Sequence, residues 1–303
     1  MTLEAVVQEP IIEEYERLGG RRLRSFMRNK PAVIAVAVLA LIILSAVFAP
    51  LIAPFDPSEI DLMNAFSKIG SHCVAPNCQL VGSHLLGTDN LGRDVFSRLL
   101  FATRISLFVG FGAIVAALTL ALPFGLIAGY LGGKLDWLVM RIIDIILSIP
   151  PLILVFAIAG VLGASMKNAI IALGIFFTPL FIRLIRSEVV NLRNSQLVET
   201  ERAIGVPDRY ILVRHILPNI ASPLIVQVSL SVGTAILAEA SLSFLGLGVQ
   251  PPSASWGTML QNAFERIVQH WWMILPSSLA IAMTVFALNV AGDGLRDALG
   301  KVR

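Results

Sequence analysis

The sequence predicts an all-α membrane protein with six transmembrane helices. Of its 303 residues, 56% are hydrophobic and only 14% are charged, and the mean hydropathy is +0.81. That is more apolar than a soluble domain needs to fill its core. The basic residues lie in short clusters beside long uncharged runs, as the loops of membrane proteins do. The expected surroundings are therefore a lipid bilayer, and nucleic acid is not an expected partner.

The first predicted span is the uncharged run 31–55, which follows a basic tail, residues 1–30. About 20 apolar residues are enough to cross a hydrocarbon core of about 30 Å. The run is too long for the apolar part of a signal peptide, which favours an uncleaved anchor. The tail carries Leu23, Phe26 and Met27 among arginines. This pattern is typical either of a helix lying on the membrane surface or of an unstructured basic tail.

Five further uncharged stretches are each bounded by charged or polar segments. They are residues 105–133, 145–166, 168–182, 216–238 and 271–292. The stretch 168–182 is short, but its helix can continue through Arg183, Arg186 and Glu188 if these long side chains reach the interface. With the N-terminus inside, seventeen of the 23 Lys and Arg residues lie in cytoplasmic segments. The positive-inside rule therefore predicts that both termini are cytoplasmic.

These spans divide the chain into the first helix, an extracytoplasmic loop and a five-helix core. The loop covers residues 56–104, and the core covers residues 105–303 and includes a cytoplasmic loop at 191–218. The two cysteines, Cys73 and Cys78, lie close together in the outer loop. On the oxidising side of the membrane they could form a local disulfide, and a metal site with His72 is the alternative.

The residue sets that would carry catalysis are missing from the sequence. No glycine-rich phosphate loop ends in Gly-Lys-Ser/Thr, no two histidines are four residues apart, and no Gly-x-Ser-x-Gly elbow occurs. The chain is therefore not predicted to be an enzyme or to hold a metal or cofactor of its own. Charged residues near the spans, Arg141, Asp144 and Glu239, keep a stand-alone secondary carrier or channel open as the alternative. Arg141 and Asp144 share a helical face, so we expect them to pair with each other.

The cytoplasmic loop contains the most informative pattern in the chain. Residues 199–204 favour a helix, and Gly205 followed by Pro207 favours a turn. Residues 210–217 can resume a helix that Pro218 ends or redirects. Two short helices outside the bilayer have no core of their own to pack against, which indicates a cytoplasmic partner. A surface loop without a partner is the alternative.

This loop resembles the coupling loop of ABC-importer permeases, in which Glu-Ala-Ala is followed by three residues, Gly, nine residues and Ile-x-Leu-Pro. The positions in register are Glu199, Gly205, Leu217 and Pro218. The departures are Thr200 and Glu201 in place of the alanines and His215 in place of the isoleucine. They leave the spacing intact and make the packed face more polar.

Other segments are similar to the second, C-type permease of dipeptide and oligopeptide ABC importers, of the peptide, opine and nickel group. They are residues 28–31, 84–94 with Ser97 and Arg98, 104–107, 239–252, Trp256 with Gly257, and 292–299. The resemblance covers nearly the whole chain. It implies the type I ABC importer permease fold and a location in the bacterial inner membrane.

The resemblance also implies partners and cargo. The partners would be a homologous second permease subunit, two ATPase subunits that bind ATP and Mg, and an extracytoplasmic substrate-binding protein. The cargo would be di- or oligopeptides or related small solutes, since related systems also serve glutathione, nickel chelates and opines.

Two groups of residues receive roles from the resemblance. Coupling to the ATPases would fall to Glu199, Thr200, Glu201, Ala203, Ile204, Gly205, Val206, Leu217 and Pro218. Ile204 and Val206 would contact the ATPase or, alternatively, pack against their own spans. The outer gate or the contact with the binding protein would involve Gln250, Pro251, Pro252 and Trp256. A simple interfacial anchor is the alternative for Trp256.

Overall fold

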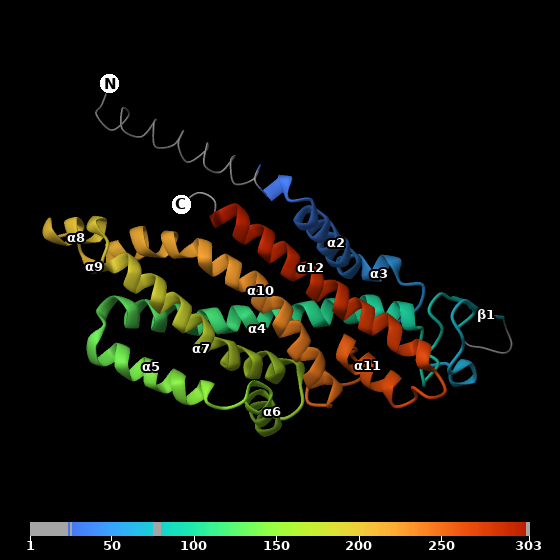
Figure 1. Ribbon diagram of the computed structural model, residues 1–303. Coiled ribbons are helices and arrows are strands. Elements are labelled where there is room, and N and C mark those ends of the chain that lie inside the picture. The colour runs from blue at the N-terminus through green and yellow to red at the C-terminus, as the bar shows by residue number, and fades with distance from the viewer. Residues whose placement is uncertain (1–23, 25, 75–79, 301–303) are drawn as a thin grey trace.

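The structure, a computed structural model, describes residue 24 and residues 26–74 and 80–300, and its long helices form an elongated bundle (Figure 1). The bundle helices are α2 (Lys30–Val47), α4 (Val95–Leu131), α5 (Gly133–Leu147), α6 (Pro151–Leu162), α7 (Met166–Arg193), α10 (Leu217–Phe244) and α12 (Ile274–Gly300). The shorter elements are α3 (Ala49–Ile52), η1 (Leu62–Asn64), the antiparallel strands β1 (Ser71–Cys73) and β2 (Gly82–His84), α8 (Gln196–Ala203), α9 (Asp208–Tyr210), the π-helix η2 (Ile211–Ile216), α11 (Trp256–Phe264) and η3 (Trp271–Met273).

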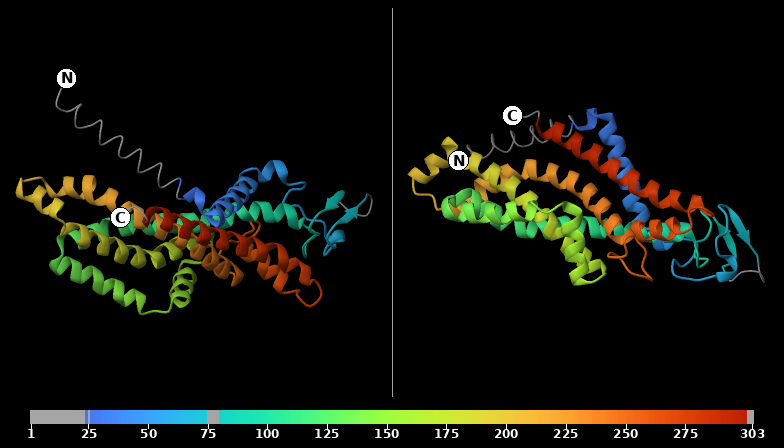
Figure 2. Two further views of the ribbon diagram at one scale, coloured as in Figure 1. Left: turned by 45° about the horizontal axis from the view of Figure 1, so that its top comes forward. Right: turned by 60° about the horizontal axis from the view of Figure 1, so that its bottom comes forward.

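Within the described residues, five helices are long and apolar enough to cross a membrane, and the bent pair α5 and α6 makes a sixth crossing if it is counted as one. This agrees with the predicted number of spans. The expectation for the tail, residues 1–30, lies largely outside the described residues. Figures 1 and 2 show α8 and α9 at one end of the bundle and the β1–β2 hairpin at the opposite end.

The third predicted span is not one straight helix. Helices α5 and α6 meet at an angle of 91°, and the break falls at Pro150 and Pro151, where Pro150 has an extended backbone with ψ of 134°. A proline lacks the N–H that would continue a helix and forces the residue before it out of the helical conformation. The length and the lack of charge of this run do not by themselves distinguish a straight helix from a bent one.

Two arginines of α7 pair with aspartates of α5. Asp144 forms a 2.8 Å ion pair with Arg183, which corrects the expected pairing of Asp144 with Arg141. Arg186 makes two hydrogen bonds to Asp136, of 2.5 and 2.6 Å. Helix α7 does continue through these arginines to Arg193, as predicted. The arginines are held by carboxylates of a neighbouring helix as well as by the interface.

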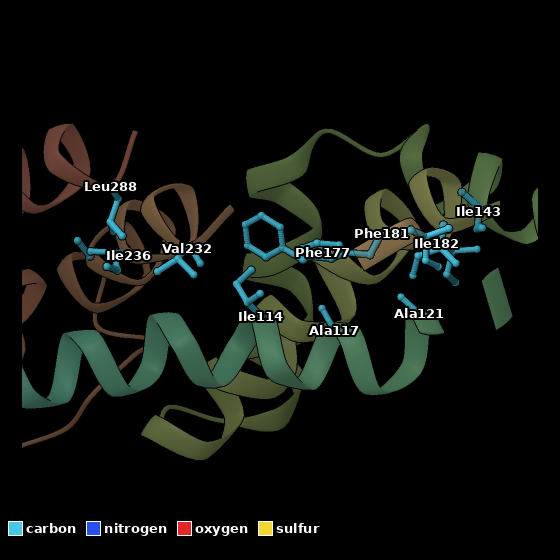
Figure 3. Close-up of a cluster of buried hydrophobic side chains, with 14 of the residues drawn as sticks. Ile114, Ala117, Ala121, Ile143, Phe177, Phe181, Ile182, Val232, Ile236 and Leu288 are labelled. Carbon is cyan, nitrogen blue, oxygen red and sulfur yellow. The ribbon is translucent and has the colours of Figure 1, made fainter. Parts of the chain in front are cut away.

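The core is built on a close contact between α4 and α7. A Cβ atom added to Gly125 would lie 2.8 Å from Cβ of Ile185, and one added to Gly129 would lie 2.8 Å from Cβ of Val189. Glycines at such positions let two helix backbones approach closely, which is how helices associate inside membranes. Side chains of α10 and α12, among them Ile236, complete the core (Figure 3).

At the end of the bundle that carries the β1–β2 hairpin, α4 begins at Val95, ten residues before the uncharged stretch does. Asp94 caps the helix by accepting a 2.7 Å hydrogen bond from the N–H of Ser97. Charged groups in this region are buried as pairs, such as Arg93 with Asp89. Cys73 ends β1 and is disulfide-bonded. Cys78 lies outside the described residues, so the pairing of the two cysteines stays a prediction.

Candidate functional site

The 199–218 segment begins with α8, which ends in a tight turn. Gly205 adopts φ of +82°. Its N–H donates to the carbonyl of Arg202 (3.0 Å), and the N–H of Val206 donates to the carbonyl of Glu201 (3.0 Å). These two bonds make a Schellman motif, which requires a left-handed residue and therefore favours glycine. The predicted helix and turn are confirmed.

The second helix of this segment does not stop at Pro218. Residues 208–244 form one continuous helical stretch, in which the π-helix η2 leads directly into α10. The N–H of Leu217 donates to the carbonyl of Leu212, five residues back. Because the wider π-turn and the first turn of α10 do not use the N–H that Pro218 lacks, the proline is accommodated. The expectation that Pro218 ends the helix is wrong, because the helical stretch continues through it.

The turn is fixed to the end of α4 by a polar cluster. The Tyr130 hydroxyl donates a 2.5 Å hydrogen bond to Asp208. The Arg202 guanidinium lies 4.7 Å from the Tyr130 ring centroid and 3.7 Å from the Asp208 carboxylate. Arg193 at the end of α7 donates a 3.0 Å bond to the Tyr130 carbonyl. The segment is thereby joined to the end of α4, which Arg193 in turn links to α7.

A second contact ties α8 to η2. Glu201 lies 3.1 Å from Nε2 of His215, and both side chains are largely buried. These are two of the residues that depart from the resembled pattern, and the structure brings them together. Their polar groups therefore pair with each other inside the segment. Glu199 and Thr200, by contrast, are exposed in the middle of α8.

The two apolar residues that flank Gly205 differ in their surroundings. Ile204 is 74% exposed, whereas Val206 packs against the hydrophobic core. Ile204 is therefore available to a partner, and Val206 follows the alternative of packing against its own spans. Other large apolar side chains exposed on this end are Leu197, Tyr210 and Val213.

In the segment that was predicted to form the outer gate, Gln250, Pro251 and Pro252 are exposed, but Trp256 is completely buried. Trp256 donates from its backbone N–H to Ser106 (3.1 Å) and from Nε1 to Thr103 (3.3 Å) of α4. A direct contact of Trp256 with a binding protein and a role as interfacial anchor are both incompatible with this burial. It is a core residue that joins α11 to α4.

The cluster around Tyr130 could not be found by sequence reasoning, because Tyr130 and Asp208 are 78 positions apart. Among the described residues, no group of three or more His, Cys, Asp or Glu side chains could hold a metal ion. The 199–218 segment thus carries an exposed apolar side chain, Ile204, beside a turn that Tyr130 and Arg202 hold against α4.

Known families match both parts of the chain. Residues 121–301 match the model of the binding-protein-dependent transport system inner membrane component, and residues 18–68 match the N-terminal transmembrane domain of oligopeptide transport permease C. The protein is therefore a transport permease of the bacterial inner membrane. It belongs to the family of binding-protein-dependent transport system inner membrane components, which agrees with the prediction that it is not an enzyme.

Named relatives are similar over nearly the whole length. The dipeptide transport system permease protein DppC of Alkalihalophilus pseudofirmus is 40% identical over 91% of this chain and 87% of its own. The di/tripeptide permease DppC of Pseudomonas aeruginosa is 41% identical over 91% and 89%. The glutathione permease GsiD of Pectobacterium atrosepticum is 39% identical over 91% and 88%.

The fold is that of a solved ABC transporter chain. A chain of the inward-facing MetNI methionine ABC transporter aligns with a TM-score of 0.57 and 18% identity, covering 69% of this chain and 98% of its own. The predicted type I importer permease fold is thus confirmed.

Proposed function

We propose that this chain is the C-type membrane-spanning subunit of an ATP-driven importer of di- or oligopeptides or related small solutes. Its expected partners are a homologous second permease, two ATPase subunits that bind ATP and Mg, and an extracytoplasmic binding protein. Both termini and the 199–218 segment would lie in the cytoplasm. The relatives named for dipeptide and glutathione transport support the cargo class.

One contrast supports the coupling role: the Ile204 side chain is exposed, whereas the segment that carries it is held against a membrane helix. Ile204 is 74% exposed at the tip of a segment that Tyr130 and Arg202 hold against α4. An exposed apolar side chain on a rigid base is suited to enter a groove of a partner and to pass its displacement to the membrane helices. A stand-alone carrier would have no use for such a tip.

The test is to purify the complex through a tag on this chain and compare Ile204→Asp with wild type. We expect Ile204→Asp to lose the ATPase subunits or the ATP hydrolysis stimulated by the binding protein. Leu85→Asp, at an exposed apolar position (55%) of the outer end, is the matched control and should keep both. If no ATPase subunit ever co-purifies with the wild type, the carrier alternative replaces this proposal.

A further inference from the structure

One face of α10 is hollowed along most of its length. An inner cavity of about 500 Å³ lies between α7, α10 and α12, and an outer cavity of about 770 Å³ lies between α6, α10, α11 and α12. The α10 residues that line them include Pro223, Val226 and Leu230 in the inner cavity and Leu237 and Ser241 in the outer one. Their spacing of three or four residues, with one step of seven, puts them on one helical stripe.

The two cavities differ in chemistry. The outer cavity is lined mainly by apolar side chains, such as Phe156 and Phe286. The inner cavity contains both an acidic and a basic side chain, Glu188 of α7 and Arg296 of α12, together with the amide of Gln227. The stripe on α10 therefore leads from an apolar outer half to an inner half that offers charge of both signs.

Glu188 and Arg296 line the inner cavity with charges of opposite sign. Within the part of the chain that the structure describes, neither side chain makes an ion pair or a hydrogen bond, whereas Arg183 and Arg186 on the same α7 segment are both paired with α5. Arg296 is exposed and Glu188 is half-buried, so both charges are available to a ligand in the cavity. The two opposite charges lining one cavity match the two ends of a zwitterion.

We infer that the inner cavity binds the backbone of a short peptide during its passage, with the peptide's amino group at Glu188 and its carboxylate at Arg296. This inference rests on the proposed function and specifies a cargo site for it. The volume falls within the range of about 300–1,000 Å³ of small-molecule sites. Arg296 presents the planar donor pair that suits a carboxylate, and the Gln227 amide can pair with a peptide group.

Direct binding to the purified complex in lipid nanodiscs, without nucleotide and without binding protein, tests the site. The probes are glycyl-leucine, N-acetylglycyl-leucine and glycyl-leucinamide, followed by saturation-transfer NMR titration. In the wild type, blocking either end should weaken binding about tenfold, because each block removes one charge-assisted hydrogen bond. Glu188→Gln should become insensitive to acetylation, and Arg296→Gln should become insensitive to amidation.

Asp297→Asn is the matched control, because Asp297 is an exposed carboxylate beside Arg296 on α12 that does not line the cavity. It should respond to both blocks as the wild type does. Co-purified ATPase subunits and the melting temperature check that each variant assembles.

Two results would overturn the inference. One is equal binding of all three probes to the wild type; the other is a wild-type complex that imports glycyl-leucine with ATP and binding protein yet binds none of the probes. Uptake on the same preparation tests the proposed function separately. A complex that imports no peptide refutes the proposed function, and the cargo site with it.

Discussion

Tyr130, near the last residue of α4, donates its hydroxyl hydrogen to Asp208, at the start of the helical stretch that becomes α10. The same carboxylate lies 3.7 Å from Arg202 of α8, whose guanidinium covers the Tyr130 ring. Helix α8 and the stretch that becomes α10 thus both contact the Tyr130 side chain of α4, close to the exposed Ile204. A displacement of the tip must move α4 and α10 with it, or break this cluster.

Tyr130→Phe tests the cluster with the loss of one oxygen atom. We expect the complex to assemble but the stimulation of ATP hydrolysis by the binding protein to fall, because one hydrogen bond of about 1 kcal/mol no longer fixes the segment to α4. Tyr210→Phe is the control, since Tyr210 is 52% exposed on the same segment. Equal stimulation in wild type and Tyr130→Phe would contradict the role of the cluster.

The turn at Gly205 allows backbone conformation to be tested separately from side-chain contacts. A Cβ atom added there would meet nothing within 4 Å, while φ is +82°. Gly205→Val should therefore impair coupling only through the strain of a left-handed conformation, which is about 1–3 kcal/mol. Gly205→Asn should retain most of the coupling, because asparagine tolerates this conformation. Binding-protein-stimulated ATP hydrolysis of the two variants distinguishes backbone strain from loss of a contact: equal loss in both argues against strain.

Gly129 tests the close approach of α4 and α7. An added Cβ would lie 2.8 Å from Cβ of Val189 and 3.0 Å from the Arg186 carbonyl, so Gly129→Ala should cost about 1–3 kcal/mol by overpacking and lower the melting temperature. Gly160→Ala in α6 is the control, because nothing lies within 4 Å of its added Cβ. A melting temperature of Gly129→Ala at or above that of Gly160→Ala would show that the helices can separate without cost.

Much of the fold could be predicted because bilayer thickness fixes the length of an uncharged helix. The exceptions have local causes. The bend between α5 and α6 depends on Pro150 and Pro151, yet Pro123 and Pro179 lie inside continuous helices. A proline alone does not decide between a kink and a break, because neighbouring helices can satisfy the freed carbonyls. Helix α4 starts earlier than predicted because charged residues near its start are buried as pairs. A hydropathy scale treats such residues as solvent-exposed.

The candidate site was predictable to the extent that it is local in sequence. The helix 199–204 and the turn at Gly205 follow from residues next to one another. The braces do not, since Tyr130 meets Asp208 only after α4 and α10 have packed. The alternatives for Ile204 and Val206 likewise needed the tertiary structure, which exposes the first and packs the second.

The burial of Trp256 leads to a prediction that differs from the gate or contact role that its motif suggested. Trp256 is fully buried, and its ring N–H and backbone N–H bond to Thr103 and Ser106 of α4. Trp256→Ala should therefore lower the stability of the protein by about 3–5 kcal/mol, the usual cost of emptying a large aromatic site in a core. Trp271→Ala, at a position that is 63% exposed, should have little effect on stability. Thermal unfolding gives a melting temperature for each variant. It is followed by light scattering, because that signal does not depend on tryptophan fluorescence. The contrary result is a Trp256→Ala variant that keeps the melting temperature of the wild type but loses affinity for the binding protein. Trp256 would then act at the surface, and this end of the bundle would have to open in solution to expose it.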